Sequence, residues 1–477
     1  MAAMLAASWT GSLGLVAGIG RKSANRCREA YNIMKKPYLC IVMGAAGRDF
    51  HVFLSFLRGN DRFRVVAFTA TQIPFIDTRS FPQSLAGPGY DSDIPIHDES
   101  ELGRLIEQHD VDFVFFAYSD IEHAEVMHKA SLVQAAGASF VMLGPDHTQL
   151  ASDKPVVSIT ATRTGAGKSP LTQWLAQTLR DRGRRAAVIR HPMPYGNLSM
   201  QRVQRFASPA DLDDHDCTIE EREEYAPYVD MGIPIYAGVD YQGILDQAAS
   251  DADLVLWDGG NNDFSFIRPD LDLVVVDALR AGHETDYFPG EVNFRRADVL
   301  VISKCGSAEE GAIQGIRERA SRYNPEAAVC TSDLGIRVAE PERIEGQRVL
   351  VIEDGPTVTH GGMSFGAGTV AARRYGATIV DPRPYAVGTI RDTFASNPHL
   401  DRVLPAMGYS QAQRESLQAT INDCCEAENV ALVMDASPAR LDRMLDLQVP
   451  LMRVEYHFVQ LDGPPLDEKV LSLLEDP

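Results

Sequence analysis

The stretch VVSITATRTGAGKSPLTQWL, residues 156–175, decides the fold of the middle of this 477-residue chain. Its first residues form a β-rich run, the following turn ends in Gly167-Lys168-Ser169, and apolar residues then recur at helical spacing. A strand, a glycine-bearing turn ending in Gly-Lys-Ser, and a helix form the pattern of a phosphate-binding P-loop. Thr162 stands where the motif has its first glycine, but that position requires a tight turn rather than phosphate contact. The sequence therefore predicts a P-loop.

Each chemical role in a P-loop has a residue in this turn. Gly165 and Gly167 allow successive backbone N–H groups to curve around phosphates, Lys168 supplies positive charge, and the hydroxyl of Ser169 binds magnesium. We expect the nucleotide to contact the whole turn, which consists of Thr164, Gly165, Ala166, Gly167, Lys168, Ser169 and Pro170.

A P-loop also needs an acidic residue at the end of a neighbouring buried strand, where it helps to position magnesium. The segment ADLVLWDGGNNDF, residues 252–264, supplies one, because LVLW predicts a strand and Asp258 follows it. Asp258 is therefore the predicted second metal residue, and Asn261 or Asp263 is expected to orient water or substrate. A later strand ends in Ser303-Lys304-Cys305-Gly306, which lacks the aspartate of the guanine-selecting Asn-Lys-x-Asp motif.

The segment that begins at Tyr38 predicts a Rossmann-like βαβ unit, with YLCIVM and RVVAFTA as strands around the turn GAAGRDF. Phe50 occupies the third glycine position of a dinucleotide fingerprint, and no acidic residue closes the second strand, so a nicotinamide cofactor is not expected. Arg48 and His51 are expected to hold a phosphate or carboxylate of the substrate at a helix N-terminus. A turn that only reverses the chain is the alternative.

Other basic residues follow predicted strands, where ligands bind in open parallel sheets. Arginine donates two parallel hydrogen bonds to a phosphate, so these residues are candidate anchors for an anionic substrate. Ordinary ion pairs are the alternative. The candidates are Arg190, His191, His283, His360 in a glycine-rich loop, and Arg383 in DPRP.

Composition limits the classes of partner. The chain has 45 lysines and arginines against 66 acidic residues, a net charge of −21, which argues against binding to nucleic acid or to an anionic membrane. An anionic ligand must therefore be bound by local positive groups. Seven cysteines without a CxxC pair indicate neither a disulfide framework nor a zinc site, so a reducing cytoplasm is expected. After the first residues, no run reaches the ~20 apolar residues that span a bilayer.

These patterns predict an α/β protein with three domains. A Rossmann-like domain is expected over residues 38–150 and a P-loop NTPase domain with a mostly parallel sheet over residues 151–395. A small C-terminal α/β cap is expected over residues 396–477. Residues 1–37 contain a single acidic residue and are expected to be a flexible extension or an over-long start, for which Met34 is the alternative initiator. A targeting peptide is the alternative.

Eight strings that occur in order make the chain resemble the cyclic 2,3-diphosphoglycerate synthetase family over nearly all of residues 38–460. They are GAAGRDFH, FTATQIPFI, RTGAGKS, IRHPMPYG, WDGGNNDF, GHETDYFPGE, EDGPTVTHGGMSFGAG and DPRP. The resemblance implies ATP-dependent closure of 2,3-diphosphoglycerate to a cyclic phosphoanhydride, with release of ADP and phosphate. It also implies Mg²⁺ as cofactor and cytoplasmic homodimers, with GTP as the alternative nucleotide because bacterial relatives are often labelled GTPases.

Such a reaction needs γ-phosphoryl transfer to one group, attack by the other, and expulsion of phosphate, so it depends on positioning and charge neutralisation. Lys168, Asp258 and Arg163 are the expected catalytic residues. The expected partner is a small anionic phosphorylated metabolite, without nucleic acid or membrane. A GTP- or ATP-hydrolysing switch or metallochaperone-like NTPase that acts on a partner protein is the alternative. Intact Lys168, Ser169 and Asp258 argue against a third possibility, a nucleotide sensor without catalysis.

Overall fold

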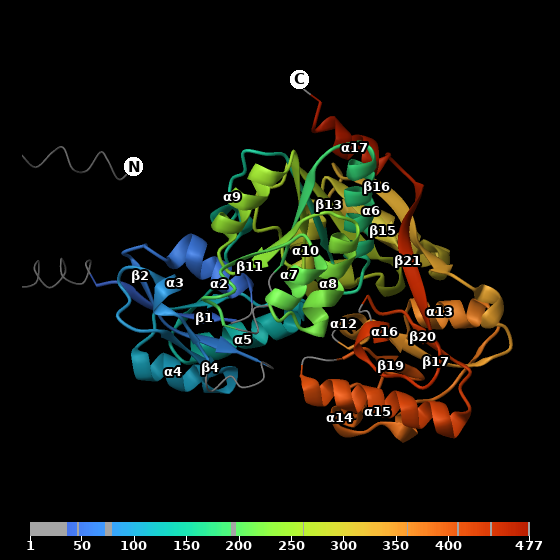
Figure 1. The fold of residues 1–477 in the computed structure, drawn as a ribbon. Coiled ribbons are helices and arrows are strands. Elements are labelled where there is room, and N and C mark those ends of the chain that lie inside the picture. Colours follow the sequence, from blue (N-terminus) through green and yellow to red (C-terminus); the bar gives the residue numbers. More distant parts are fainter. Residues whose placement is uncertain are drawn as a thin grey trace, which may run out of the picture.

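The structure, a computed structural model, describes residues 36–44, 47–71, 79–191, 197–260, 262–359, 361–407, 410–438 and 441–475. The predicted extension, residues 1–37, lies outside these residues except for its last two positions. The described chain forms an α/β fold of two large, mostly parallel sheets with helices on their faces (Figure 1). This confirms the predicted fold class. Among the described residues, no helix combines the length and apolar character that crossing a bilayer requires.

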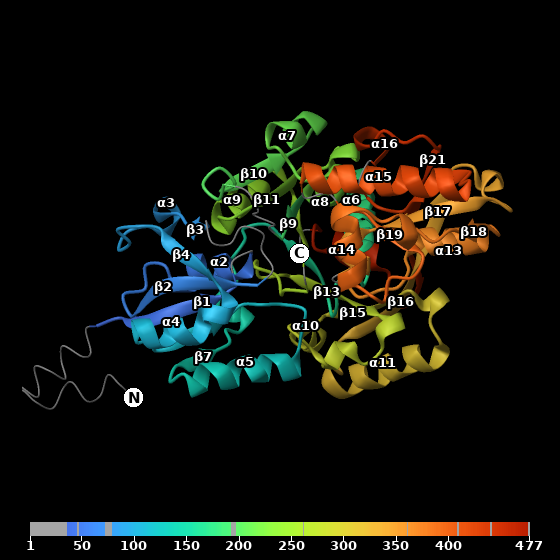
Figure 2. The same ribbon diagram turned by 90° about the horizontal axis from the view of Figure 1, so that it is seen from below.

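The N-terminal domain is a Rossmann-like layer structure built on a sheet in the order β3-β4-β2-β1-β5-β7. Its strands are parallel except for the β3–β4 pair. Helices α2 and α3 pack on one face and α4 and α5 on the other (Figure 2). The strands are β1 (Tyr38–Met43), β2 (Phe63–Ala70), β3 (Ser80–Phe81), β4 (Ile94–Asp98), β5 (Phe113–Phe116) and β7 (Ser139–Val141), and the helices are α2 (Arg48–Val52), α3 (Gln83–Ala86), α4 (Leu102–His109) and α5 (His123–Ala135).

The central sheet carries the predicted P-loop strand at its middle. This strand, β8 (Val156–Ala161), is buried along its whole length because parallel neighbours β12 and β13 flank it and helices cover both faces. The order is β10-β11-β9-β12-β8-β13-β15-β16, parallel from β11 to β16. The other strands are β9 (Ala186–Arg190), β10 (Val203–Phe206), β11 (Ile235–Gly238), β12 (Leu254–Asp258), β13 (Leu271–Asp277), β15 (Val299–Ser303) and β16 (Ala328–Val338), and the helices are α6 (Lys168–Asp181), α7 (Pro209–Asp214), α8 (Ile219–Asp230), α9 (Tyr241–Asp251), α10 (Gly290–Arg296) and α11 (Glu310–Tyr323).

The C-terminal unit continues the same sheet through one long strand, β21 (Leu451–Asp462), which pairs antiparallel with β16 and, at its start, parallel with β20. Strand β17 pairs with β18, β19 and β20, so strands on both sides of the predicted boundary at 395/396 share one section of sheet. Helix α13 covers one face, and α14 and α15 cover the other. The elements are β17 (Arg348–Glu353), β18 (Thr378–Ile379), β19 (Val403–Pro405), β20 (Leu432–Asp435), α12 (Gly355–Val358), α13 (Ala367–Arg374), α14 (Gly388–Ser396), α15 (Gln411–Glu428), α16 (Leu441–Met444) and α17 (Leu466–Ser472).

The N-terminal domain and the C-terminal unit lie on opposite sides of the central sheet (Figures 1 and 2). The N-terminal domain is joined to it by a two-stranded antiparallel pair of β6 (Ile121–Glu122) with β14 (Tyr287–Phe288), and by a bridge between Leu150 and Ile267. The P-loop at the end of β8 therefore has a neighbouring unit on each side.

The structure explains why Thr162 replaces the first glycine of the motif. Thr162 continues the ladder of β8, since its N–H donates to the carbonyl of Val275 at 3.0 Å. The glycine needed for close approach is instead Gly290, at the start of α10. A Cβ at Gly290 would lie 2.3 Å from the carbonyl oxygen of Thr162. The tight contact is therefore made by a residue far along the sequence.

Gly290→Ala is expected to lower the free energy of unfolding by about 1–3 kcal/mol, because the added methyl group overlaps backbone that cannot move without shifting the P-loop. Chemical denaturation measures the change. Gly311→Ala is the matched control, because Gly311 lies in α11 with no atom within 4 Å of an added Cβ. A Gly290 variant as stable as the Gly311 variant would contradict the proposed contact.

Candidate functional site

The turn after β8 has the backbone geometry of a P-loop. Gly165 (φ 74°) and Gly167 (φ 110°) adopt left-handed conformations that residues with side chains rarely accept. Helix α6 begins at Lys168, directly after Gly167. The N–H groups of the turn and of the first helical residues therefore meet at one place, which suits an anion.

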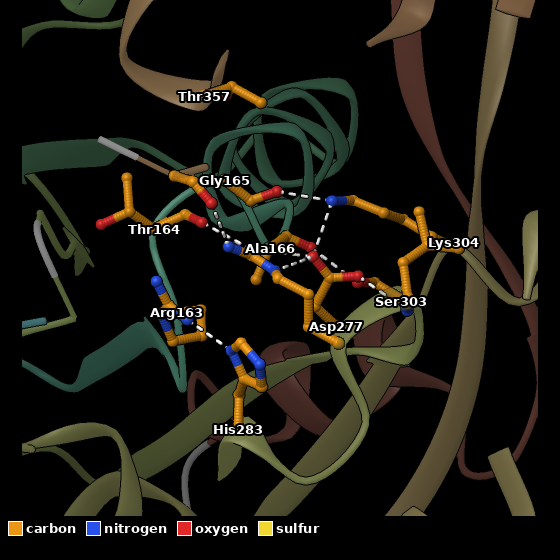
Figure 3. A network of polar contacts seen from close by, with 12 residues as sticks. Arg163, Thr164, Gly165, Ala166, Asp277, His283, Ser303, Lys304 and Thr357 are labelled. Carbon is orange, nitrogen blue, oxygen red and sulfur yellow. Dashed lines mark hydrogen bonds and ion pairs between the residues drawn. The ribbon is translucent and has the colours of Figure 1, made fainter. Parts of the chain in front are cut away.

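Three side chains hold the carbonyl groups of this turn from outside (Figure 3). Arg280 donates to the carbonyl of Thr164 at 2.6 Å, and Lys304 donates to that of Gly165 at 2.7 Å. Ser303 donates to the third carbonyl, that of Ala166, at 2.6 Å. In a trans peptide the N–H points opposite to the C=O, so these bonds turn the following N–H groups toward the ligand side.

Asp277, at the end of β13, holds both cations in place. It is 1% exposed and accepts hydrogen bonds from Lys304 at 2.8 Å and from Arg280 at 2.9 Å. Burial alone would raise the pKa of Asp277, but the charges of Lys304 and Arg280 hold it below its ordinary value of 3.8. Its carboxylate is thus the shared counter-ion of the two side chains that shape the P-loop.

Lys168 lies at the floor of the site and is 7% exposed. Its Nζ is 3.5 Å from Oδ1 of Asn262, whose amide donates to Asp120 of the N-terminal domain at 2.7 Å. Burial, and then the charge of Arg190, lower the pKa of Lys168 to about 8. Arg163, the third predicted catalytic residue, binds Asp120 at 2.7 Å and His283 in the same network (Figure 3).

Asp258 lies at the end of β12, as predicted, but its carboxylate is enclosed by protein groups. Tyr228 donates to it at 2.8 Å, Thr172 donates at 3.3 Å, and Arg190 forms an ion pair with it at 3.0 Å. Ser169, in contrast, lines the cavity described below. This arrangement fits a magnesium ion held by Ser169, phosphate oxygens and water, because Mg²⁺ keeps several waters. The described residues contain no cluster of three or more metal-ligating side chains.

A cavity of about 270 Å³ opens in front of the P-loop, between the central sheet and the C-terminal unit. Lys168 and Ser169 form one wall, and Lys304, directly after β15, and Asp333, within β16, form a second. The third wall comes from the C-terminal unit, including Asp354, Phe365 and Tyr456. The N-terminal domain contributes no residue to the described lining.

The wall that faces the P-loop is rich in carboxylates. Glu224 of α8 forms an ion pair with Arg190 at 2.6 Å, and Asp354 accepts a hydrogen bond from Thr357, which packs on the P-loop. Burial raises the pKa of both carboxyls. Burial and then the nearby charges of Asp354 and Glu224 raise the pKa of Tyr456. An acidic and aromatic surface thus lies within a few ångströms of the predicted phosphate site.

The predicted substrate contacts separate into two groups. Arg190 and His191 line the cavity beside Lys168. His283 stacks on Tyr287 and contacts Arg163, and Arg383 forms an exposed ion pair with Asp381 at 2.7 Å. His360 and Asn261 lie outside the described residues, and the described lining includes neither His283 nor Arg383.

Arg48 and His51, predicted at an anion site of the N-terminal domain, are buried where that domain meets the central sheet. Arg48 lies 3.6 Å from Asp263, and His51 stacks on Phe266 with its ring nitrogen 2.8 Å from the carbonyl of Thr148. Burial lowers the pKa of His51 to about 3. Neither residue belongs to the described lining of the cavity.

Sequence reasoning assigned no role in the site to Glu224, Asp277, Asp333 or Tyr456. Asp277 ends the predicted strand DLVVVD, so its position at the ligand edge of the sheet was a usable signal. The other three depend on tertiary packing. Glu224 lies in a helix whose sequence looks solvated, and Asp333 and Tyr456 lie on strands that no motif marks.

Asp277→Asn is expected to weaken nucleotide binding at least ~10-fold and to destabilise the fold by about 3–5 kcal/mol, because two buried cations lose their counter-ion. Titration calorimetry and denaturation measure the two effects. Asp272→Asn, on the same strand but with its side chain bonded to Ser158, is the control that should keep nucleotide affinity. Equal affinity in both variants would show that Asp277 does not organise the P-loop.

The affinity for a nucleoside triphosphate is expected to fall as the pH rises above about 8, approaching tenfold per pH unit, because the free protein loses the Lys168 proton there while bound phosphate favours the ammonium. Binding isotherms across the alkaline range measure this. Lys168→Ala should bind weakly with no such slope and should abolish turnover. A wild-type affinity that is constant through pH 9 would contradict a role for the Lys168 charge.

The chain is similar in sequence to several known proteins. The arginine synthetase ArcE of Thermococcus kodakarensis is 52% identical over 435 residues, which cover 91% of this chain and 96% of the relative. A tetraacyldisaccharide 4'-kinase of Geobacter sulfurreducens is 27% identical over 289 residues, covering 53% of this chain and 78% of the kinase. The solved structure of LpxK from Aquifex aeolicus has a TM-score of 0.37 at 12% identity and covers 68% of this chain and 89% of that one.

No protein-family model matches the chain. The similarity to ArcE nevertheless extends over nearly the full length of both proteins. The chain belongs to the family of the arginine synthetase ArcE.

Proposed function

We propose that this chain is an ATP-dependent synthetase that forms arginine or a closely related guanidino compound. The observation that carries the proposal is the acidic wall, formed by Glu224 and Asp354 with Tyr456 beside them, in the same cavity as the P-loop lysine. Carboxylates attract a substrate with ammonium or guanidinium groups and repel one that carries several phosphates. The name of the ArcE relative gives arginine as its product and so supports the same class of substrate.

The chemistry of such a reaction matches a phosphoryl-transfer site. A guanidino carbon bears three nitrogens, so a nitrogen must replace the oxygen of a ureido group. The ureido oxygen takes the γ-phosphoryl group of ATP, and ADP is released. Ammonia then attacks the ureido carbon, and the oxygen departs with the phosphoryl group as inorganic phosphate. The net reaction converts a ureido amino acid, ammonia and ATP to a guanidino amino acid, ADP and phosphate.

The residues of the site have distinct roles in this proposal. Lys168 and the amides of the P-loop neutralise the charge that shifts among the phosphate oxygens, with Mg²⁺ held at Ser169. Arg190, fixed by Asp258 and Glu224, presents a second cation beside Lys168. Asp354 holds the cationic part of the amino acid, and the cavity limits hydrolysis of the phosphorylated intermediate by water.

The second candidate is closure of 2,3-diphosphoglycerate to its cyclic phosphoanhydride. It is favoured by the meeting of Lys168, Arg190 and His191 at the cavity, because these residues come from two of the strings that carry the resemblance, RTGAGKS and IRHPMPYG. Both candidates share activation by γ-phosphoryl transfer and expulsion of phosphate. They differ in the charge of the acceptor, which the acidic wall makes unfavourable for a bisphosphate.

Purified protein with Mg-ATP is incubated with a ureido amino acid and ammonium, or with 2,3-diphosphoglycerate. We expect arginine by amino-acid analysis, together with equal amounts of ADP and phosphate, and no cyclic anhydride signal in the phosphorus NMR spectrum. Asp354→Asn should raise KM for the amino acid with little change in KM for ATP.

A cyclic anhydride signal without arginine would overturn the first candidate in favour of the second. ATP hydrolysis at a rate indifferent to either acceptor would remove both and leave the switch-like NTPase. Lys168→Ala is the control in each arm, since any product that it still forms does not arise at the P-loop.

A further inference from the structure

The segment after β15 contains a glycine where nucleotide-binding proteins with an Asn-Lys-x-Asp motif carry a base-reading aspartate. Ser303 and Lys304 occupy the first two positions, and Gly306 occupies the fourth. By sequence alone this site has no group to recognise the nucleobase. The structure brings a carboxylate to the same place from another strand.

The carboxylate belongs to Asp333 on β16. A Cβ built on Gly306 would lie 2.2 Å from Oδ2 of Asp333 and 3.1 Å from its carboxyl carbon. The Asp333 carboxylate therefore fills the space in which a side chain at position 306 would begin. The pairing of the strands explains this, because β15 ends at Ser303 while β16, paired with it through Thr331, runs on past its end.

The surroundings of Asp333 suit a planar ring joined to the phosphates of the P-loop. Lys304, Ser307, Asp333 and Leu334 line the same cavity as the P-loop glycines. A Cβ built on Gly167 would lie 3.9 Å from Cδ2 of Leu334, so this wall directly adjoins the phosphate site. The ammonium of Lys304 is bound to the carbonyl of Gly165 and to Asp277, which directs its aliphatic stem along the loop. The stem and Leu334 offer apolar surface to the faces of a ring.

Asp333 is half-buried, and its side-chain carboxylate accepts no hydrogen bond from any residue in the described ranges. An ionised carboxylate is an acceptor only, so the complementary group on a ligand is an N–H donor. On a purine, the donors that project from the ring edge are exocyclic amino groups, at position 6 of adenine and position 2 of guanine.

We propose that Asp333 is the base-reading residue of the nucleotide site and accepts a hydrogen bond from the exocyclic amino group of a purine. Asp333, on β16, thus takes the base-reading role that the aspartate at the fourth position has in proteins with an Asn-Lys-x-Asp motif. The proposal rests on the use of a nucleotide in the proposed function but not on the identity of the acceptor substrate.

The experiment compares nucleotides that differ by one amino group. Titration calorimetry gives Kd for ATP against purine riboside triphosphate, which lacks the 6-amino group, and for GTP against ITP, which lacks the 2-amino group. We expect the aminated member of one pair to bind about 10-fold or more tightly to the wild-type protein. A difference in the first pair identifies adenine as the base, and a difference in the second identifies guanine.

Asp333→Ala should reduce that ratio to about one while triphosphate binding persists. Glu309→Ala removes an exposed carboxylate just before α11 and is the control that should keep the wild-type ratio. The double variant Asp333→Gly with Gly306→Asp returns a carboxylate to the same space and should restore discrimination.

An Asp333→Ala protein that keeps the wild-type ratio, or a wild-type ratio near one in both pairs, would overturn the assignment. So would a folded double variant that binds triphosphate without discrimination. Failure of every triphosphate to bind would overturn the nucleotide-dependent function together with this inference, whereas binding without arginine formation would leave the inference intact.

Discussion

The site depends on one buried carboxylate shared by two cations. Asp277 pairs with Lys304 and Arg280, and each of these cations also donates a hydrogen bond to a carbonyl of the P-loop. Without the carboxylate, two mobile cations beside an anion site would bind phosphate directly and leave the loop unsupported. With it, their charge is balanced by protein and their geometry is fixed before the ligand arrives. The phosphate is then bound by backbone amides that are already in position, which avoids the cost of ordering the loop on binding.

The same balance of charge extends through the rest of the cavity. Arg190 lies between Asp258 and Glu224, so a guanidinium that could bind phosphate is already held by two carboxylates. Lys168 is the cation with the most freedom to respond, since its contact with Asn262 is long at 3.5 Å. A protein with a net charge of −21 thus builds its anion site from one responsive ammonium and many oriented amides.

The fold and the P-loop could be predicted because their signals are local. The strand YLCIVM is β1 to the residue, and Gly167-Lys168-Ser169 opens α6. The position of a residue at a strand end predicted the lining of the cavity less well, because that position does not determine the direction of the side chain. Arg190 and His283 have the same signal, yet Arg190 lines the cavity and His283 stacks on Tyr287. Asp333 was out of reach of sequence reasoning, because the space that it fills is defined by a glycine 27 positions earlier, in the turn that follows the neighbouring strand.

The arrangement of the three units follows from what a synthetase must do. A P-loop alone transfers a phosphoryl group to whatever acceptor reaches it, water included, so the acceptor must be enclosed. Here β21 ties the C-terminal unit to β16, next to the strand whose loop anchors the P-loop, and so fixes the acidic wall relative to Lys168. On the other side, Asn262 and Asp120 connect Lys168 to the N-terminal domain. The lysine that faces the phosphate site is therefore held, through Asn262, by the domain that contributes no described wall of the cavity.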